Sequence, residues 1–104
     1  MMLVYVVCAS EKEAEKIASA AVKERLAACA NYWPCRSVFE WKGRLEKQKE
    51  AILVLKTTGG KLKPLVRRMK QLHSYELPCI CWWKEHADSP YENWVGKQVR
   101  LEPG

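Results

Sequence analysis

Hydrophobic and polar positions along this chain repeat with helical and with strand periods, and together they predict four strands and three helices. The β-branched, aromatic run Leu3–Cys8 has the length and composition of a strand. Because both of its faces are apolar, we expect it inside a sheet. Ser10 and Glu13 then form a capping box that starts a helix at about Glu11. Apolar residues at helical spacing carry this helix to about Ala28.

A long hairpin follows the first predicted helix. Residues 29–36 are typical of an extended segment that is bent or broken at Pro34, because proline does not fit a regular central strand. The chain alternates over Ser37–Trp41, turns at Lys42-Gly43 and returns through Arg44–Lys56, an arm of about 13 residues or roughly 40 Å. An isolated ribbon is marginal in water, so we expect this arm to pair with or pack on another subunit.

The second half of the chain predicts another helix and another strand. Apolar residues at helical spacing run to Leu72. Pro64 fits only in the first turn of a helix, so we expect this helix to begin at about residues 61–63. The stretch Glu76–Trp83 is then typical of a strand, and Pro78 near its start favours a sheet edge or a bulge.

The end of the chain completes the order of elements. Ser89-Pro90-Tyr91-Glu92 is a second capping box with proline at the first helical position, and it predicts a short C-terminal helix. The order strand, helix, strand, strand, helix, strand is the ferredoxin-like arrangement, an α+β sandwich of form βαββαβ with both helices on one face of an antiparallel sheet. The length predicts a single domain, residues 1–104.

Charge and composition restrict the classes of function. The net charge is +6, and residues 59–72 hold five basic residues and no acidic one, so the rest of the chain is almost neutral. We favour a solvated basic helix over a nucleic-acid surface, because no phosphate-binding glycine loop and no aromatic RNA-binding signature are present. No apolar run of about 18 residues predicts a membrane span. Five cysteines without zinc spacing or a secretion signal predict free thiols in a reducing cytoplasm.

Candidate chemistry concentrates in residues 72–82. Cys79 and Cys81 are two apart on a predicted strand, so their side chains share a face. With His73 or Cys8 they could hold a soft metal such as Cu(I) or Zn(II). The alternative, which we favour for these two thiols, is one face of a core strand. A nucleophilic role for Cys8 has no visible histidine partner or oxyanion hole, so we expect no enzyme.

Motifs spread over nearly the whole chain are Glu24-Arg25-Leu26-Ala27-Ala28-Cys29-Ala30-Asn31, Trp41-Lys42-Gly43, Leu55-Lys56-Thr57-Thr58, His73-Ser74-Tyr75-Glu76-Leu77-Pro78 and Tyr91-x-x-Trp94. In their order and spacing they resemble the CutA divalent-cation tolerance proteins. The resemblance implies a ferredoxin-like protomer in a tight, PII-like homotrimer, with long hairpins that reach across neighbouring subunits. It also implies a link to copper and divalent-metal tolerance, without a settled catalytic activity.

The resemblance also implies site residues. The copper ligands proposed in the family correspond to Cys8 and His73, while Leu72 stands where some members have a second histidine. Cys79 replaces the usual glutamate, and with Cys81 it is a further candidate ligand for copper or another divalent cation. We expect a cytoplasmic homotrimer with a metal or small ligand in clefts between subunits. The alternative left open is a structural trimer that binds a protein partner or an anion. Candidate cleft-lining residues are Trp41, Lys56, Tyr75 and Glu76.

Overall fold

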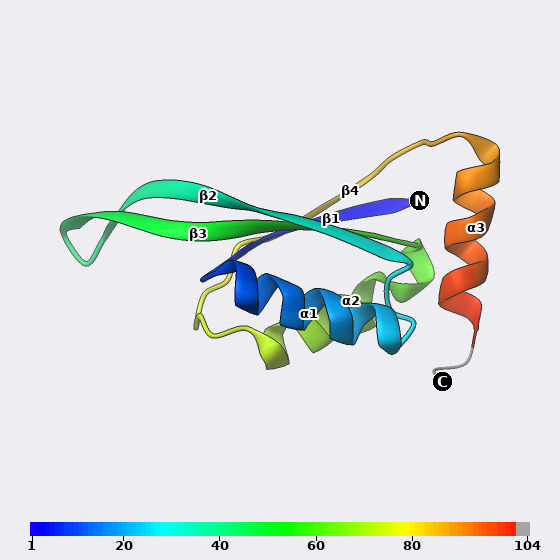
Figure 1. Ribbon diagram of the computed structural model, residues 1–104, viewed down its shortest axis with the longest axis horizontal. Coiled ribbons are helices and arrows are strands. Elements are labelled where there is room, and N and C mark those ends of the chain that lie inside the picture. The colour runs from blue at the N-terminus through cyan, green and yellow to red at the C-terminus, as the bar shows by residue number, and fades with distance from the viewer. Residues whose placement is uncertain (102–104) are drawn as a thin grey trace.

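The computed structural model describes residues 1–101, and it confirms the expected α+β fold (Figure 1). The strand order is β2-β3-β1-β4, so the two apolar strands β1 and β3 are interior, as predicted. Helices α1 and α2 cover one face of the sheet, and α3 lies at one end (Figure 1). The elements are β1 (Met2–Cys8), α1 (Glu11–Lys23), β2 (Cys29–Trp41), β3 (Arg44–Thr57), α2 (Gly59–Leu72), β4 (Ile80–Lys84) and α3 (Ser89–Arg100).

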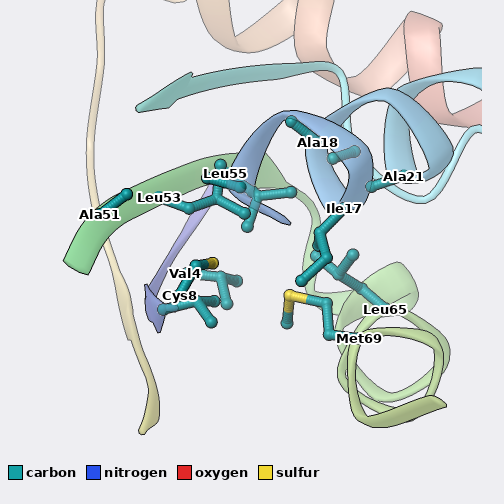
Figure 2. Packing of buried hydrophobic residues seen from close by; sticks show 13 residues of the cluster. Val4, Cys8, Ile17, Ala18, Ala21, Ala51, Leu53, Leu55, Leu65 and Met69 are labelled. Atoms are coloured by element: carbon teal, nitrogen blue, oxygen red, sulfur yellow. The ribbon is translucent and has the colours of Figure 1, made fainter. Parts of the chain in front are cut away.

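The core lies between the sheet and the two helices, as Figure 2 shows for the largest cluster of buried residues. Every second side chain of the interior strands points into it, among them Val4 of β1 and Leu53 of β3. Ile17 of α1 and Leu65 and Met69 of α2 pack against them from the helix side. Burial of each large aliphatic side chain contributes roughly 1.5–3 kcal/mol, so this layer fixes the helices on the sheet.

The opposite face of the sheet is not covered by any helix within residues 1–101 (Figure 1). Tyr5 of β1 alternates with the buried positions and therefore points to this uncovered face. Trp33 of β2 and Trp83 of β4 are 44% and 42% exposed. Trp33 lies opposite Ile52 and Trp83 opposite Leu3 in the register, which places both on the uncovered face.

The two strands of the hairpin pair along their whole length, from the start of β2 to the loop at its end. The register runs without a bulge through Pro34, which lies opposite Ala51, so the predicted break at Pro34 is wrong. β2 is an edge strand, and an edge strand tolerates proline because the nitrogen, which has no hydrogen to donate, can face away from the sheet.

The hairpin arm extends well beyond the helices (Figure 1), and it accounts for the long dimension of a molecule that measures 46 × 27 × 20 Å. The predicted turn is confirmed, with φ values of 52° at Lys42 and 78° at Gly43. Positive φ at both central residues is the two-residue geometry that matches the twist of the strands. The arm carries exposed apolar side chains at Val38, Phe39, Trp41 and Leu45.

Helix α1 ends at Lys23, so the prediction that it runs to about Ala28 is wrong. The cause is Arg25, which adopts a left-handed φ of 60°. The Leu26 amide then donates to the carbonyl of Ala21 at 2.9 Å, the long bond of a Schellman motif. Glycine is the usual residue at this position, and its absence hid the helix end in the sequence.

Two further boundaries differ from the predictions. Helix α2 begins at Gly59 rather than at residues 61–63, so Pro64 lies inside the helix and not in its first turn. The loss there is one intrahelical hydrogen bond, which the packing of the helix on the sheet offsets. Strand β4 begins at Ile80 rather than at Glu76, and it is an edge strand, as proline near its start indicated.

The last helix, α3, forms where the sequence places it but with a different cap. Its N-cap residue is Asp88 and not Ser89, so the predicted capping box is wrong. The Glu92 carboxylate instead accepts a hydrogen bond from the amide of Ala87 at 3.0 Å. No helix within the described residues is both long enough and apolar enough to cross a membrane.

Candidate functional site

Three elements meet at one corner of the fold, which we call the Cys-Glu-His corner after Cys8, Glu13 and His73. Cys8 ends β1, Glu13 lies in the first turn of α1, and His73 follows the last residue of α2. The thiol sulfur, a carboxylate oxygen and an imidazole nitrogen all lie within 4.8 Å of one another. The fold thus brings together the two residues implied by the family resemblance, and it adds Glu13, which the sequence analysis missed as a ligand.

The His73 ring is buried, and both of its nitrogens already have hydrogen-bond partners. Nε2 lies 2.8 Å from the carbonyl oxygen of Val7, which can only accept, so Nε2 carries the proton and donates. Nδ1 accepts a hydrogen bond from the amide of Tyr75 at 3.0 Å. This pattern describes a neutral imidazole that ties the end of α2 to the end of β1.

The Glu13 carboxylate closes the same corner from the side of α1. One oxygen accepts from the amide of Ala9 at 2.9 Å, and the other accepts from the amide of Ser74 at 3.0 Å. Nδ1 of His73 lies 3.7 Å from the first oxygen. Burial on its own raises the pKa of Glu13, but the hydrogen bonds from Ala9 and Ser74 outweigh it, so the pKa is lowered. The carboxylate is therefore ionised at neutral pH.

The Cys8 thiol is fully buried beneath this carboxylate. Burial raises the pKa of Cys8 to about 12, and the negative charges of Glu13 and Glu50 add to the effect. Glu50 is itself buried and accepts a 2.6 Å hydrogen bond from the Tyr75 hydroxyl. Burial and this bond raise the pKa of Tyr75. At neutral pH the thiol is protonated, and a protonated thiol is a weak nucleophile.

The donor set of the corner fits a borderline divalent cation. One sulfur, one nitrogen and one oxygen are ligand types that copper and zinc accept. Binding has a cost, because the cation must displace the proton of Cys8 and the Tyr75 amide that occupies Nδ1 of His73. The Cys-Glu-His corner can therefore bind a metal ion only weakly and with release of a proton.

The four predicted cleft residues do not come together within one protomer. Trp41 is at the tip of the arm, 47% exposed, whereas Lys56 lies at the other end of β3 and donates to the side chain of Asn31 at 3.0 Å. Tyr75 joins the Cys-Glu-His corner, and Glu76 beside it is exposed. A cleft with all four side chains would require residues from more than one copy of the chain.

Cys79 and Cys81, which we call the thiol pair, lie apart from that corner. The two sulfurs are 3.8 Å apart, so the predicted common face is confirmed. Both residues are exposed, and the prediction that they belong to the core is wrong. The reason is that Cys81 lies opposite Tyr5, on the uncovered face of the sheet. Leu77, which precedes β4, is 76% exposed.

A basic groove runs between α2 and the edge strand β4. It has a volume of about 770 Å³, and no acidic residue is among the residues that line it. Arg68, which is not one of them, forms an ion pair with Glu24 at 2.9 Å. The residues that line the basic groove are Leu62, Lys63, Val66, Arg67, Lys70, Gln71 and Trp82.

Comparison with known sequences gives consistent matches over nearly the whole chain. The family model described as CutA1 divalent ion tolerance protein matches residues 2–98. The divalent-cation tolerance protein CutA of Archaeoglobus fulgidus is 38% identical over 97 residues, which cover 92% of this chain and 95% of that protein. The animal relatives are longer, and the matched segment covers 64% of the CutA homolog of Xenopus laevis and 52% of mouse CutA.

Solved structures of CutA proteins have the same fold over nearly the whole chain. CutA1 from Pyrococcus horikoshii has a TM-score of 0.90 and 32% identity, covering 94% of this chain and 97% of that one. The PII-like protein CutA from a Nostoc species has a TM-score of 0.89 and 26% identity, covering 95% and 97%. Fold, sequence motifs and coverage agree, and the chain belongs to the CutA1 divalent ion tolerance protein family.

Proposed function

We propose that this protein is a cytoplasmic, non-enzymatic homotrimer that binds copper or another divalent cation at the Cys-Glu-His corner and acts as a PII-like signalling scaffold. The observation that carries the proposal is the approach of three ligand atoms, from Cys8, Glu13 and His73, to within 4.8 Å of one another. The family supports it, because its members are named for tolerance of divalent cations.

The chemistry of the corner sets the strength and pH dependence of this binding. The thiol of Cys8 has a pKa of about 12, so a cation that binds the thiolate must release one proton below that pH. Each unit of rising pH then strengthens the apparent affinity by about tenfold. Such a site binds a metal ion reversibly, which suits a tolerance or sensing role better than a structural metal centre.

A titration with Zn(II) tests the site, since zinc is a redox-inert probe for a position proposed for copper. The background is Cys79→Ser/Cys81→Ser, which removes the exposed thiol pair. We expect His73→Ala to weaken binding at least tenfold, and His86→Ala to leave it unchanged because His86 is exposed. Equal affinity in all three proteins would refute a site at His73, and thermal melts of each variant control for folding.

The trimer is supported by the shape of the protomer. The arm extends beyond the helices and exposes apolar residues, and the face of the sheet opposite the helices is uncovered (Figure 1). Apolar surface of this kind usually marks a protein interface. Light scattering should give a mass three times the 12.0 kDa of one chain. A monomeric mass for the folded protein would contradict the proposal.

The basic groove favours a second candidate, an interaction trimer that docks an anion or an acidic protein partner. Lys63, Arg67 and Lys70 line it without an acidic neighbour in the lining, which gives charge complementarity to such a ligand. Pyrophosphate is a suitable probe. Lys63→Glu/Arg67→Glu should abolish its binding, and the matched exchange Lys12→Glu/Lys16→Glu on α1 should not. If both double variants weaken binding equally, only net charge matters and the groove is not a site.

A further inference from the structure

The basic groove combines two kinds of side chain, of which a small inorganic anion would contact only one. We propose that it binds a short acidic segment of a partner protein, which places carboxylates on the cations and an aliphatic or aromatic side chain on the apolar residues. The inference rests on the second candidate above, docking in this groove, and it names the partner. The cations are Lys63, Arg67 and Lys70, and the apolar residues are Leu62, Val66 and Trp82.

The positive charges of the groove form one stripe along a helix. Lys63, Arg67 and Lys70 are four and three residues apart in α2, so they share a face of that helix. All three are exposed, and α2 contains no acidic residue. No ion pair within residues 1–101 uses any of the three, whereas Arg68 is held by Glu24. The stripe is therefore available to the carboxylates of a ligand.

The apolar residues of the groove form a surface between α2 and β4. Leu62 and Val66 are one turn apart in α2, and both pack against the core while remaining partly exposed. Trp82 lies opposite the buried Val4, so it points to the helix-covered face, yet it is 49% exposed. The volume of about 770 Å³ is within the range of about 300–1,000 Å³ that ligand pockets occupy. An apolar side chain of a ligand can therefore be buried here.

The groove lies on the side of the sheet that the proposed trimer leaves open. Helices α1 and α2 cover one face of the sheet, and the groove borders α2 on that side (Figure 1). Trp83, the next residue of β4, lies opposite Leu3 and points to the uncovered face, where we place the contacts between subunits. Trp82 and Trp83 thus serve opposite faces, and burial of the uncovered face does not bury the groove.

The lining favours an acidic protein segment over a nucleic acid. Arginine and lysine pair with carboxylates as well as with phosphates, so the charges alone fit both. The apolar residues decide between them, because Leu62 and Val66 are aliphatic and offer no ring on which bases could stack. Aliphatic and aromatic side chains pack well on such a surface. Tryptophan and arginine, here Trp82 and Arg67, are also the residues that most often dominate the affinity of protein interfaces.

Two fluorescein-labelled peptides of equal charge test the inference by fluorescence anisotropy, Asp-Glu-Leu-Glu-Leu-Glu-Asp and Asp-Glu-Ser-Glu-Ser-Glu-Asp. We expect the wild type to bind the leucine peptide at least tenfold more tightly than the serine peptide. Trp82→Ala should lose this preference and keep its affinity for pyrophosphate within twofold, whereas Lys63→Glu/Arg67→Glu should bind none of the three probes. Trp94→Ala is the matched control, because Trp94 is 41% exposed but lies on α3, outside the groove.

The outcomes separate this inference from the docking candidate on which it rests. Equal affinity of the wild type for both peptides, with pyrophosphate still bound, overturns the inference alone, and this comparison requires no variant to fold. Loss of pyrophosphate binding as well removes both. Tighter binding of single-stranded oligothymidylate than of the leucine peptide would assign the groove to nucleic acid and overturn the inference. So would a Trp82→Ala protein that stays folded but falls to a monomeric mass in light scattering, since the groove would then hold a second copy of the chain.

Discussion

Two cysteine-bearing regions of this protein lie on opposite faces of the sheet, one at the end of β1 and one beside it. At the end of β1, Cys8 points to the helix-covered face, under Glu13 and beside His73. On the other face, β1 lies beside Cys79 and Cys81, whose thiols are exposed. Both regions contain thiols, but Cys8 is buried and the thiol pair is exposed. In the corner each donor atom takes part in the packing or the hydrogen bonds that hold the fold together, whereas the two exposed thiols do not pack in the core.

The largest expected difference between the two regions is in thiol reactivity. Burial raises the pKa of Cys8 from its ordinary value of 9.0 to about 12, so ionisation alone slows alkylation about a thousandfold at pH 8. Cys79 and Cys81 should therefore be alkylated in the native protein long before Cys8. Mass spectrometry of peptides after timed iodoacetamide exposure measures this, and comparable rates for Cys8 and Cys81 would contradict a closed corner.

The next effect is on stability. His73→Ala removes the bonds to Val7 and Tyr75 and leaves a cavity, so the free energy of unfolding should fall by about 2–4 kcal/mol. His86→Ala should change it by less than about 0.5 kcal/mol, because that side chain is exposed. Urea denaturation measures both. An equally small effect of the two substitutions would mean that His73 does not hold the corner together.

The pH dependence of stability tests the contribution of Glu13 to the buried corner. Its pKa in the folded state is lowered from the ordinary value of 4.5, so its ionisation contributes stability that is fully present above that value. The contribution is lost as the pH falls through the lower folded pKa. Glu13→Gln should therefore flatten the acid limb of a plot of urea midpoint against pH, while leaving Ser10 as the helix cap. An unchanged acid limb would show that other carboxylates dominate it.

The smallest effect is expected at the thiol pair. Cys79→Ser and Cys81→Ser should each change the free energy of unfolding by less than about 0.5 kcal/mol, since exposed side chains outside the packing contribute little. The same urea denaturation checks this. A loss of more than about 2 kcal/mol would place these side chains in a buried interface and not in an open site.

The sequence predicted the fold well because its evidence is local. Runs such as Leu3–Cys8 are apolar on both faces, which is the pattern of a strand in the interior of a sheet. Helix and strand ends were less predictable, since they depend on tertiary context. Arg25 takes a left-handed conformation where glycine is expected, and Pro64 is held inside a helix that packs on the sheet.

The candidate site was predictable only in part. Cys8 and His73 came from the family resemblance, and no periodicity links two residues so far apart in the chain. Glu13 had a local signal, because a capping-box carboxylate turns back toward the start of its helix, which here is the end of β1. Alternation placed Cys79 and Cys81 on one face correctly, but it cannot say which face of an edge strand the helices cover.

The central claim is that Cys8, Glu13 and His73 hold a divalent cation at the Cys-Glu-His corner. A Zn(II) titration in the Cys79→Ser/Cys81→Ser background tests it most directly. We predict that His73→Ala weakens Zn(II) binding at least tenfold and that His86→Ala leaves it unchanged. Equal affinity of all three proteins for Zn(II) would contradict the claim.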